Sequence, residues 1–296
     1  MLAVLATPLF VVSAVAEDGD LIGSPEWYQV SSTDRLMDVA TLFHIGYVEL
    51  LAANPGINPW IPGGGTEILL PAQHILPNAP REGVVLNLAD LRLYYFPSDG
   101  GAAQSYAIGV GRAGWSTPMG ETTVSRKRTD PTWTPPASVR AERPELPAVV
   151  PAGPENPLGA HAIYLAWPAY LIHGTNIPAG VGRRVSHGCI RMFPGDIAVL
   201  FPQVENGTKV LVVDQPIKVG WLGGELYLEV HPTAKQHDNV EYREDLTPDP
   251  LPVLMDIVRA AAGADMERVD INHVYQMARD RTGVPARITV PQASES

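Results

Sequence analysis

The spacing of apolar residues divides the chain into three parts. Near the amino terminus, residues 27–30 and 66–71 alternate as two strands, and helical spacing predicts two helices between them. A mainly β region follows over residues 81–214, where apolar positions recur with period two. Beyond it, one alternating run at residues 225–230 precedes two stretches with helical spacing. We therefore expect a βααβ unit, a mainly β domain and an extension of one strand and two helices.

The middle region carries most of the expected strands. Alternation and β-branched or aromatic residues predict six of them, over residues 83–88, 91–96, 105–111, 163–166, 170–172 and 208–213. Ala89-Asp90 separates the first two as a hairpin turn does, and residues 194–201 read as a short helix. Residues 130–158 are punctuated by proline, so we expect a long irregular loop that is functional or mobile.

Residue types at the helix ends refine this picture. Thr33 or Asp34 can cap the first amino-terminal helix. In the carboxyl-terminal extension, the first helix stops at Gly263 and the second starts after Asp270. We expect both helices to pack against the middle domain, and residues 287–296 to form a loose tail.

Composition narrows the class of function. A formal net charge of -11 and a pI near 5.1 argue against nucleic acid or an anionic membrane surface as the main partner. Residues 2–16 are almost wholly apolar or small and end in Ala14-Val15-Ala16, which predicts a signal peptide over residues 1–16. The usual basic start is missing, since no Lys or Arg precedes Arg35. We expect an exported protein, in which an idle thiol risks oxidation without structural return.

The single cysteine, Cys189, is the first candidate for chemistry. A thiolate is a strong nucleophile, and an imidazole brought close by folding can take the thiol proton, a role for which His173 is the candidate. Gly188 lets the chain turn sharply and aims its own N–H and that of Cys189 at one point, as an oxyanion requires. The second ring nitrogen of His173 needs an acceptor, either the Gly174 carbonyl or a nearby side chain.

The amino-terminal unit, residues 26–72, resembles the LysM domain, which binds the glycan of peptidoglycan and chitin. The resemblance rests on five short matches, Tyr28-x-Val30, Asp34-x-Leu36, Val39-Ala40, Asn54-Pro55 and Ile68-x-Leu70-Pro71. Thr33 stands where LysM domains commonly have glycine. The resemblance implies a βααβ fold and glycan binding, and a structural spacer is the alternative.

Residues 82–214 resemble the YkuD domain of bacterial L,D-transpeptidases. The match lies in His173-Gly174-Thr175-Asn176 and in Ser186-His187-Gly188-Cys189-Ile190-Arg191, together with the Gly111–Gly120 turn and Asn156-Pro157-Leu158-Gly159. The amino-terminal unit and the start of the extension at residues 215–296 resemble the ErfK/YbiS/YcfS branch. The resemblance implies a mainly β sandwich, no cofactor, a periplasmic location and inhibition by carbapenems.

The resemblance also implies roles for individual residues. Cys189 is the nucleophile, His173 the base and Gly174 its backbone orienter, while N–H groups of His187, Gly188 and Cys189 form the oxyanion site. Supporting and substrate-contacting positions are Ser186, Arg191, Asn176, Thr175 and Tyr106. The implied reaction releases D-Ala from a tetrapeptide stem at diaminopimelate and passes the acyl group to an amine. That amine belongs to another stem, or to a lysine of an outer-membrane protein or lipoprotein.

Three alternatives stay open at this point. His161, His173, His187 and Cys189 are potential zinc ligands, although no H-x-x-E-H pattern or cysteine pair accompanies them. An L,D-carboxypeptidase or endopeptidase would form the same thioester and pass it to water. A protein that binds peptidoglycan without catalysis would leave the thiol idle. Sequence alone does not separate the acyl acceptors, because all share the first half-reaction.

Overall fold

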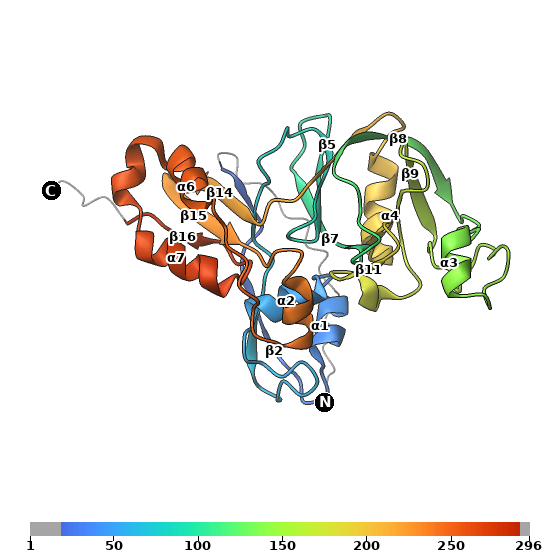
Figure 1. The fold of residues 1–296 in the computed structure, drawn as a ribbon, viewed down its shortest axis with the longest axis horizontal. Coiled ribbons are helices and arrows are strands. Elements are labelled where there is room, and N and C mark those ends of the chain that lie inside the picture. The colour runs from blue at the N-terminus through green and yellow to red at the C-terminus, as the bar shows by residue number, and fades with distance from the viewer. Residues whose placement is uncertain (1–18, 291–296) are drawn as a thin grey trace, which may run out of the picture.

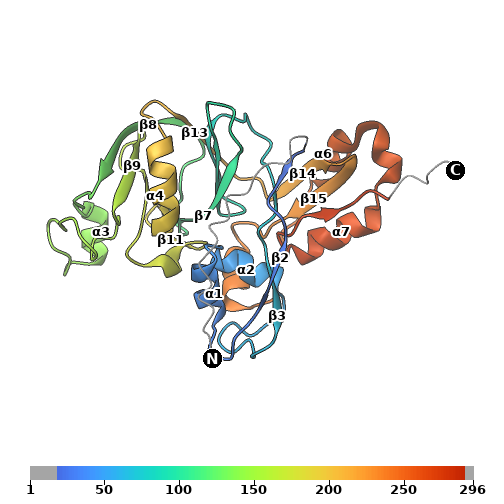
Figure 2. The same cartoon turned by 180° about the vertical axis from the view of Figure 1, so that it is seen from behind.

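A computed structural model describes residues 19–290 and shows three lobes (Figure 1). The strand-rich middle lobe lies on the right of Figure 1 and the carboxyl-terminal region on the left, with the amino-terminal unit below them, and Figure 2 shows the same arrangement from behind. Five clusters of buried apolar side chains form the cores of the described residues, the largest in the middle lobe. The mainly β fold class is confirmed. The expected signal peptide, residues 1–16, lies outside the described residues.

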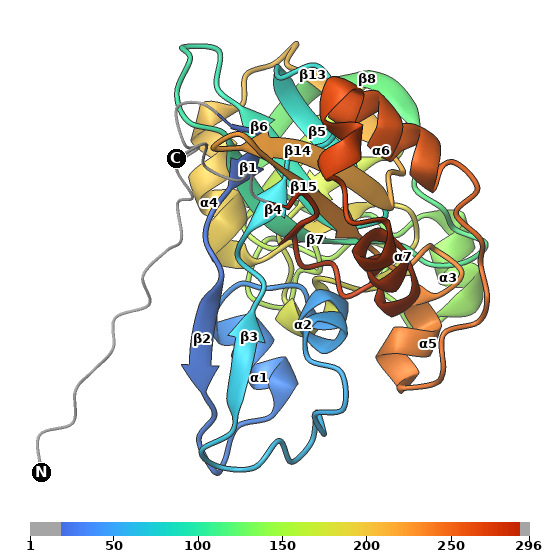
Figure 3. The ribbon, with the colours of Figure 1, turned by 90° about the vertical axis from the view of Figure 1, so that its left-hand side faces the viewer.

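The amino-terminal unit has the expected order of strand, two helices and strand. Its elements are β2 (Glu26–Gln29), α1 (Leu36–Leu42), α2 (Tyr47–Ala53) and β3 (Glu67–Leu70). β2 and β3 pair antiparallel, and both helices lie against one side of this ribbon (Figure 3). Buried residues at helical spacing, such as Leu36, Val39 and Leu50, form a core of their own.

The predicted cap of α1 is wrong. Arg35 is the N-cap residue, and neither Thr33 nor Asp34 caps the helix. The carboxylate of Asp34 instead accepts hydrogen bonds from the Ser31 N–H and the Tyr28 hydroxyl, both at 2.8 Å. These bonds pin the turn that leads into the helix, so the acidic side chain stabilises the loop and not the first helical turn.

The strands of the middle lobe pair into a closed ring. The strands are β5 (Gly83–Asn87), β6 (Arg92–Phe96), β7 (Gln104–Gly111), β8 (Gly120–Thr129), β9 (His161–Leu165), β10 (Leu171–His173), β12 (Ile190–Met192) and β13 (Lys209–Val213). Their order is β7-β12-β10-β9-β8-β13-β5-β6, and β6 pairs with β7 to close it, while β11 (Arg184–Ser186) adds to β7. β7 and β8 thus belong to both faces of a sandwich.

Two α-helices and a one-turn 3-10 helix complete the middle lobe. α4 (Pro194–Gln203) places Ile197 and Leu200 in the core between the two faces. The segment expected to be irregular contains a short helix, α3 (Ala137–Glu142), which lies beside β9 at the edge of the lobe (Figure 2). A one-turn helix, η1 (Pro178–Gly180), sits in the loop between β10 and β11.

The carboxyl-terminal region differs from its prediction. It holds three strands, β14 (Ile217–Leu222), β15 (Glu225–Val230) and β16 (Ala286–Arg287), and four helices, α5 (His237–Tyr242), α6 (Leu254–Ala262), η2 (Gly263–Arg268) and α7 (Ile271–Asp280). α6 packs on β14 and α7 on β15, so both helices bury their apolar faces in a separate core and not against the middle lobe. Residues 287–290 are not a loose tail, because Ile288 is buried and Thr289 bridges to Val269.

The three lobes meet along buried contacts. β1 (Leu21–Ile22) and β4 (His74–Ile75) pair antiparallel, and Ile22 packs with Val85 and Tyr94 of the middle lobe. The amino-terminal unit touches the loop before β11, where the Val48 N–H donates to the Gly182 carbonyl at 3.2 Å. Gly182 has φ +71°, and a Cβ there would lie 2.2 Å from Gly46, so only glycine fits this junction.

Among residues 19–290, no single helix is long and apolar enough to cross a membrane. α1 and α2 pass a test of length and composition only as a pair, and they are bent by 116° relative to each other.

Candidate active site

Adjacent parallel strands bring Cys189 and His173 together. β10 pairs with β12 so that His173 lies opposite Arg191 and Ile172 opposite Ile190. One step back along this register puts Cys189 opposite Leu171. Because side chains alternate along a strand, Cys189 and His173 project from the same face as diagonal neighbours, about 8 Å apart at Cα. Ile172 and Ile190 point the other way into the core.

His173 is a neutral imidazole whose Nδ1 is hydrogen-bonded to the backbone. Its Nδ1 lies 2.6 Å from the Gly174 carbonyl oxygen, which assigns the proton to Nδ1. This leaves Nε2 as the nitrogen that can accept a proton. Burial of the ring, together with the charge of Arg191, lowers the pKa of His173 to about 4, against a smaller opposing effect of the Gly174 hydrogen bond. The ring is therefore a neutral base at pH 7.

Cys189 is held as a thiol. Burial raises its pKa above the ordinary value, although a backbone hydrogen bond with Leu171 and the charge of Arg191 oppose this. Its Sγ lies 3.5 Å from the Ala169 carbonyl oxygen, the weak acceptor for the S–H. The resting pair is thus a thiol and a neutral imidazole, so the sulfur becomes a nucleophilic thiolate only if a base takes its proton.

The turn before Cys189 is pinned by two hydroxyl groups. Ser186 Oγ donates to the Cys189 carbonyl at 2.6 Å and accepts from the Gly188 N–H at 3.1 Å. Thr117 Oγ1 donates to the Gly188 carbonyl at 2.9 Å. Among the described residues, the N–H groups of His187 and Cys189 donate to no other atom. The Gly188 N–H, which was expected to face an oxyanion, donates to Ser186 Oγ in this structure.

Gly188 is required by its conformation and by its neighbours. It has φ +102°, and a Cβ at this position would lie 2.9 Å from Cε1 of Tyr170. Tyr170 belongs to the β9–β10 loop, whose Ala169 carbonyl faces the thiol. Tyr170 and Thr117 were not among the predicted site residues. Only the resemblance of the Gly111–Gly120 turn could have pointed to Thr117.

Arg191 lies on the same face as His173 and is without an ion pair. Its guanidinium passes close to Gly180 of η1, where an added Cβ would come within 3.1 Å of Nη1. Within residues 19–290, it makes no salt bridge or hydrogen bond through its side chain. Burial lowers the pKa of Arg191, while the guanidinium stays charged at neutral pH. A half-buried cation without a partner is suited to a carboxylate ligand.

The segment 130–158 is tied to the cysteine turn. Glu142 of α3 accepts from Arg112 at 2.6 and 2.9 Å and contacts Nε2 of His187 at 2.9 Å. The side chain of His187 thus binds α3, while its N–H stays free. At the base of the segment, buried Asn156 donates to the carbonyl oxygens of Pro131 and Pro151. Neither Glu142 nor Asn156 was assigned a role in the site from the sequence.

Three predicted substrate contacts lie at different depths. Asn176 is exposed, and its Nδ2 donates to the Glu155 carbonyl at 3.1 Å, which links it to segment 130–158. Thr175 is buried and holds its own loop through Ile177. The Tyr106 hydroxyl donates to Gln104 beside α4, so the structure places Tyr106 in that hydrogen-bond network and not with Cys189.

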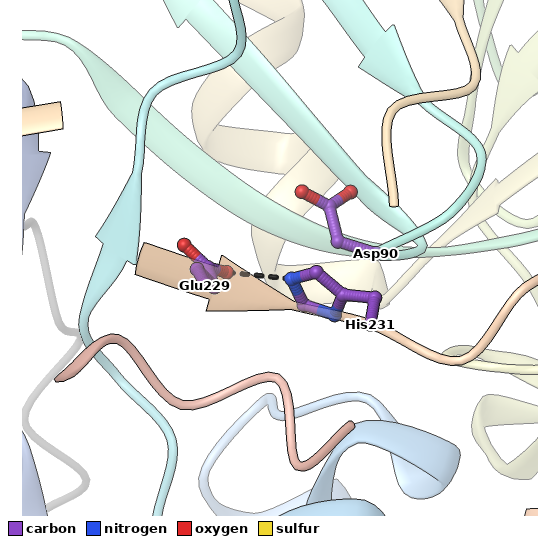
Figure 4. A group of neighbouring side chains, drawn as sticks. All are labelled: Asp90, Glu229 and His231. Atoms are coloured by element: carbon purple, nitrogen blue, oxygen red, sulfur yellow. Dashed lines mark hydrogen bonds and ion pairs between the residues drawn. The ribbon is translucent and has the colours of Figure 1, made fainter. Parts of the chain in front are cut away.

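The four residues of the zinc alternative do not lie together within coordinating distance of one metal ion. Among the described residues, one group of three or more potential metal ligands lies within coordinating distance, namely Asp90, Glu229 and His231 (Figure 4). The ammonium of Lys218 lies 2.8 Å from Asp90 and 2.9 Å from Glu229. It therefore occupies the position between the two carboxylates that a metal ion would need. This donor set does not fit a divalent metal, because the lysine charge opposes it.

The arrangement around Cys189 is suited to acyl transfer through a covalent intermediate. It offers a thiol, a neutral imidazole on the adjacent strand, two free N–H groups beside the sulfur and an unpaired guanidinium on the same face.

Comparison with known proteins agrees with this chemistry. Residues 81–212 match the YkuD family, described as the L,D-transpeptidase catalytic domain. The chain is 42% identical over 284 residues to "Probable L,D-transpeptidase YcfS" of Escherichia coli K12, covering 93% of this chain and 87% of that protein. It is 39% identical to "Probable L,D-transpeptidase ErfK/SrfK" of Salmonella typhimurium LT2, covering 92% and 89%.

A solved structure shows a more distant likeness. The catalytic domain of the E. faecium L,D-transpeptidase acylated by ertapenem is 26% identical, covers 46% of this chain and 99% of its own, and has a TM-score of 0.35. The two sequence relatives span most of the chain, including the regions outside the YkuD match. The chain therefore belongs to the L,D-transpeptidase family.

Proposed function

We propose that Cys189 of this L,D-transpeptidase attacks a tetrapeptide stem of peptidoglycan at the L-centre of diaminopimelate and transfers the acyl group to an amine. The observation that carries the proposal is the thiol of Cys189 on the same sheet face as a buried, neutral His173, whose Nδ1 is committed to Gly174. This pairing leaves Nε2 to move a proton to and from the reacting groups.

The first half-reaction forms a thioester. The Cys189 sulfur bonds to the diaminopimelate carbonyl carbon while His173 Nε2 takes the thiol proton. The tetrahedral oxyanion lies against the N–H groups of His187 and Cys189, which have no other acceptor among the described residues. The bond to D-Ala then breaks, and the proton on His173 passes to the departing amine.

The second half-reaction returns the enzyme to its resting state. An acceptor amine attacks the thioester carbonyl, His173 removes its extra proton, and the C–S bond breaks to restore the thiol of Cys189. The acceptor is the side-chain amine of diaminopimelate in another stem, or a lysine of an outer-membrane protein or lipoprotein. Water as acceptor would make the same chain an L,D-carboxypeptidase or endopeptidase.

The amino-terminal unit is proposed as a glycan-binding LysM-like domain of an exported, periplasmic enzyme. Its βααβ arrangement supports this role, as do two exposed indole rings, Trp27 at 68% and Trp60 at 67% exposure. Exposed aromatic rings are suited to sugar faces, since they combine apolar area with rigid geometry. Firm docking on the middle lobe would keep glycan binding and acyl transfer in one rigid body.

Intact-mass analysis tests the proposed reaction. The protein is incubated with a diaminopimelate tetrapeptide, alone and with candidate acceptor amines, and compared with Cys189→Ala. We expect a covalent adduct that has lost D-Ala, absent from the variant, and transfer of the acyl group when an amine is added. Free acid as the product in the presence of amine would establish the hydrolase instead. An adduct that also forms on Cys189→Ala would overturn the nucleophile. Inhibition by a carbapenem is expected to act through the same thiol.

A further inference from the structure

The sheet register divides the side chains of the Arg126-Lys127-Arg128 run between two faces of the sheet. Along the strand, Lys127 lies opposite Ile163, while Arg126 lies opposite Tyr164 and Arg128 opposite Ala162. Ile163 is fully buried in the core. Lys127 therefore points inward, where its Nζ donates to the Phe201 carbonyl of α4 at 2.7 Å. Arg126 and Arg128 project from the opposite face.

That opposite face is the catalytic face. The register continues from Ala162 to His173 and on to Arg191, so that Arg128, His173 and Arg191 share one row across the strands. A second row runs from Arg126 over Tyr164 and Leu171 to the position of Cys189. Three strand spacings of about 4.8 Å separate β8 from Cys189, or about 14 Å.

The two arginines are exposed and without acidic partners. Among residues 19–290, neither side chain forms a salt bridge or hydrogen bond, although the protein is strongly acidic overall. The guanidinium of Arg126 is instead held 4.1 Å above the ring of Tyr164, which orients it on the catalytic face. With Arg191, the catalytic face thus carries three guanidinium groups that pair with no acidic residue in the described part of the chain.

We propose that Arg126 and Arg128 form a subsite that binds a carboxylate of the donor stem peptide on the acyl side of the scissile bond. The inference rests on the proposed function. Three extended residues reach about 10 Å, so a stem that crosses the strands from Cys189 over Leu171 and Tyr164 ends within reach of the β8 arginines. Guanidinium groups bind carboxylates through bidentate hydrogen bonds, which a lysine ammonium does not form. The subsite selects anionic stems and sets their direction across the sheet.

The test compares Arg126→Gln/Arg128→Gln with the unchanged protein and with Arg279→Gln. Arg279 is an exposed cation on α7, so its loss makes a charge change remote from the site. The second-order rate of Cys189 acylation is measured with a diaminopimelate tetrapeptide, with the same stem amidated at its acyl-side carboxylates, and with a carbapenem. We expect the double variant to lose about ten- to a hundredfold in rate with the free tetrapeptide only. The amidated stem should react equally slowly with the variant and the unchanged protein.

Further measurements separate this role from a structural one. Arg126→Lys/Arg128→Lys should recover part of the rate, and added salt should slow the unchanged protein more than the glutamine variant. Three results would overturn the subsite. The glutamine variant could react with the free tetrapeptide at an unaltered rate, or could lose as much rate with the carbapenem. Its defect could also be confined to transfer of the acyl group onto the acceptor. If the unchanged protein reacts with the carbapenem and not with the tetrapeptide, the proposed function fails and the subsite with it.

Discussion

The resting protonation state of the catalytic pair follows from burial at the residue scale. Desolvation raises the pKa of the Cys189 thiol and lowers the pKa of the His173 imidazole, so both groups favour their neutral forms. A thiolate–imidazolium pair would need the opposite shifts. On the proposed function, the pair reacts when a substrate carbonyl arrives and the oxyanion forms beside the N–H groups of His187 and Cys189, which restricts nucleophilic attack to bound substrate.

The rate of Cys189 acylation should therefore begin to fall only at an unusually low pH. His173 loses its function as a base only when it is protonated, and its pKa of about 4 places that loss well below the ordinary histidine value of 6.5. We expect kcat/KM for acylation to stay level from about pH 8 to pH 5 and to fall below that. The measurement is the rate of carbapenem adduct formation against pH, with His173→Gln as the inactive control. A midpoint near 6.5 would contradict a buried neutral ring.

Substitution of Gly188 by alanine should abolish acylation and leave the fold intact. The new Cβ meets the Tyr170 ring at 2.9 Å, and φ +102° is strained for alanine, so the turn before Cys189 must shift. We expect a loss of at least about a hundredfold in acylation rate, because small displacements of catalytic groups are costly. Gly207→Ala is the matched control, since Gly207 has φ +89° with nothing within 4 Å of an added Cβ. Equal activity losses in both variants would assign the effect to strain alone.

At the scale of elements, the sequence predicted strands with apolar alternation and missed the polar ones. The hairpin of β5 and β6 is confirmed with Ala89-Asp90 in the turn, because each strand is rich in apolar residues. β8 was missed, since its exposed positions carry Glu121, Arg126 and Arg128, and Val124 is its single apolar side chain, so no apolar alternation marks it as a strand. Its strand conformation comes from pairing with β9 and β13, which is long-range information.

The candidate site shows the same division. The motif that contains Cys189 and the distant His173 were identified from residue chemistry and resemblance, because both carry specific chemistry. Two further residues hold the turn before Cys189 and were missed. Thr117 donates a hydrogen bond to Gly188, 71 positions further along the chain. Tyr170 acts through the packing of its ring against Gly188. Only the register of folded strands shows that Arg126 and Arg128 share the face of the thiol.

The contact between α3 and the turn before Cys189 predicts that Glu142 limits the motion of α3. Glu142 receives hydrogen bonds from His187 and Arg112, which lower its pKa, so its carboxylate is charged at neutral pH. We expect Glu142→Gln to increase amide hydrogen exchange over residues 137–142, since the pairing that holds α3 is lost. Glu145→Gln is the control, because Glu145 pairs only with Arg143 in the same segment. Unchanged exchange in Glu142→Gln would show that the proline-rich backbone alone holds α3.

On the scale of the whole molecule, buried charges join the three lobes. Glu49 of α2 pairs with Arg92 of β6 at 2.9 Å, and Lys218 of β14 pairs with Asp90 of the β5–β6 turn and with Glu229 of β15. Each of these side chains is almost fully buried. Sequence could not predict this network, because Lys218 and Asp90 lie 128 positions apart in the chain and none of the paired residues belongs to a recognisable motif. The charges fix the relative positions of the lobes, since a displaced partner would leave a buried ion unpaired.

Replacing Lys218 by methionine should destabilise the protein strongly. Burial raises the pKa values of Asp90 and Glu229, but the charge of Lys218, together with smaller effects of His231 and of hydrogen bonds to the carboxylates, outweighs burial and leaves both pKa values lowered. Without the ammonium, two carboxylates share a buried site, and we expect the free energy of unfolding to fall by about 3–5 kcal/mol. Chemical denaturation at pH 7 measures this change. Lys209→Met is the control, since the Lys209–Glu82 pair is exposed and its loss should not change stability measurably.

The pH dependence of this destabilisation distinguishes lost charge pairing from lost packing. In the unchanged protein, the two carboxylates have lowered pKa values in the folded state, so their contribution to stability is present above the unfolded pKa of about 4 and is lost as pH falls. In Lys218→Met the folded pKa values rise above that reference, and the folded state binds more protons than the unfolded one. The stability difference between the two proteins should therefore shrink as pH falls from 7 toward 4. A difference that stays constant over this range would mean that packing of the lysine stem, and not the buried charge, joins the lobes.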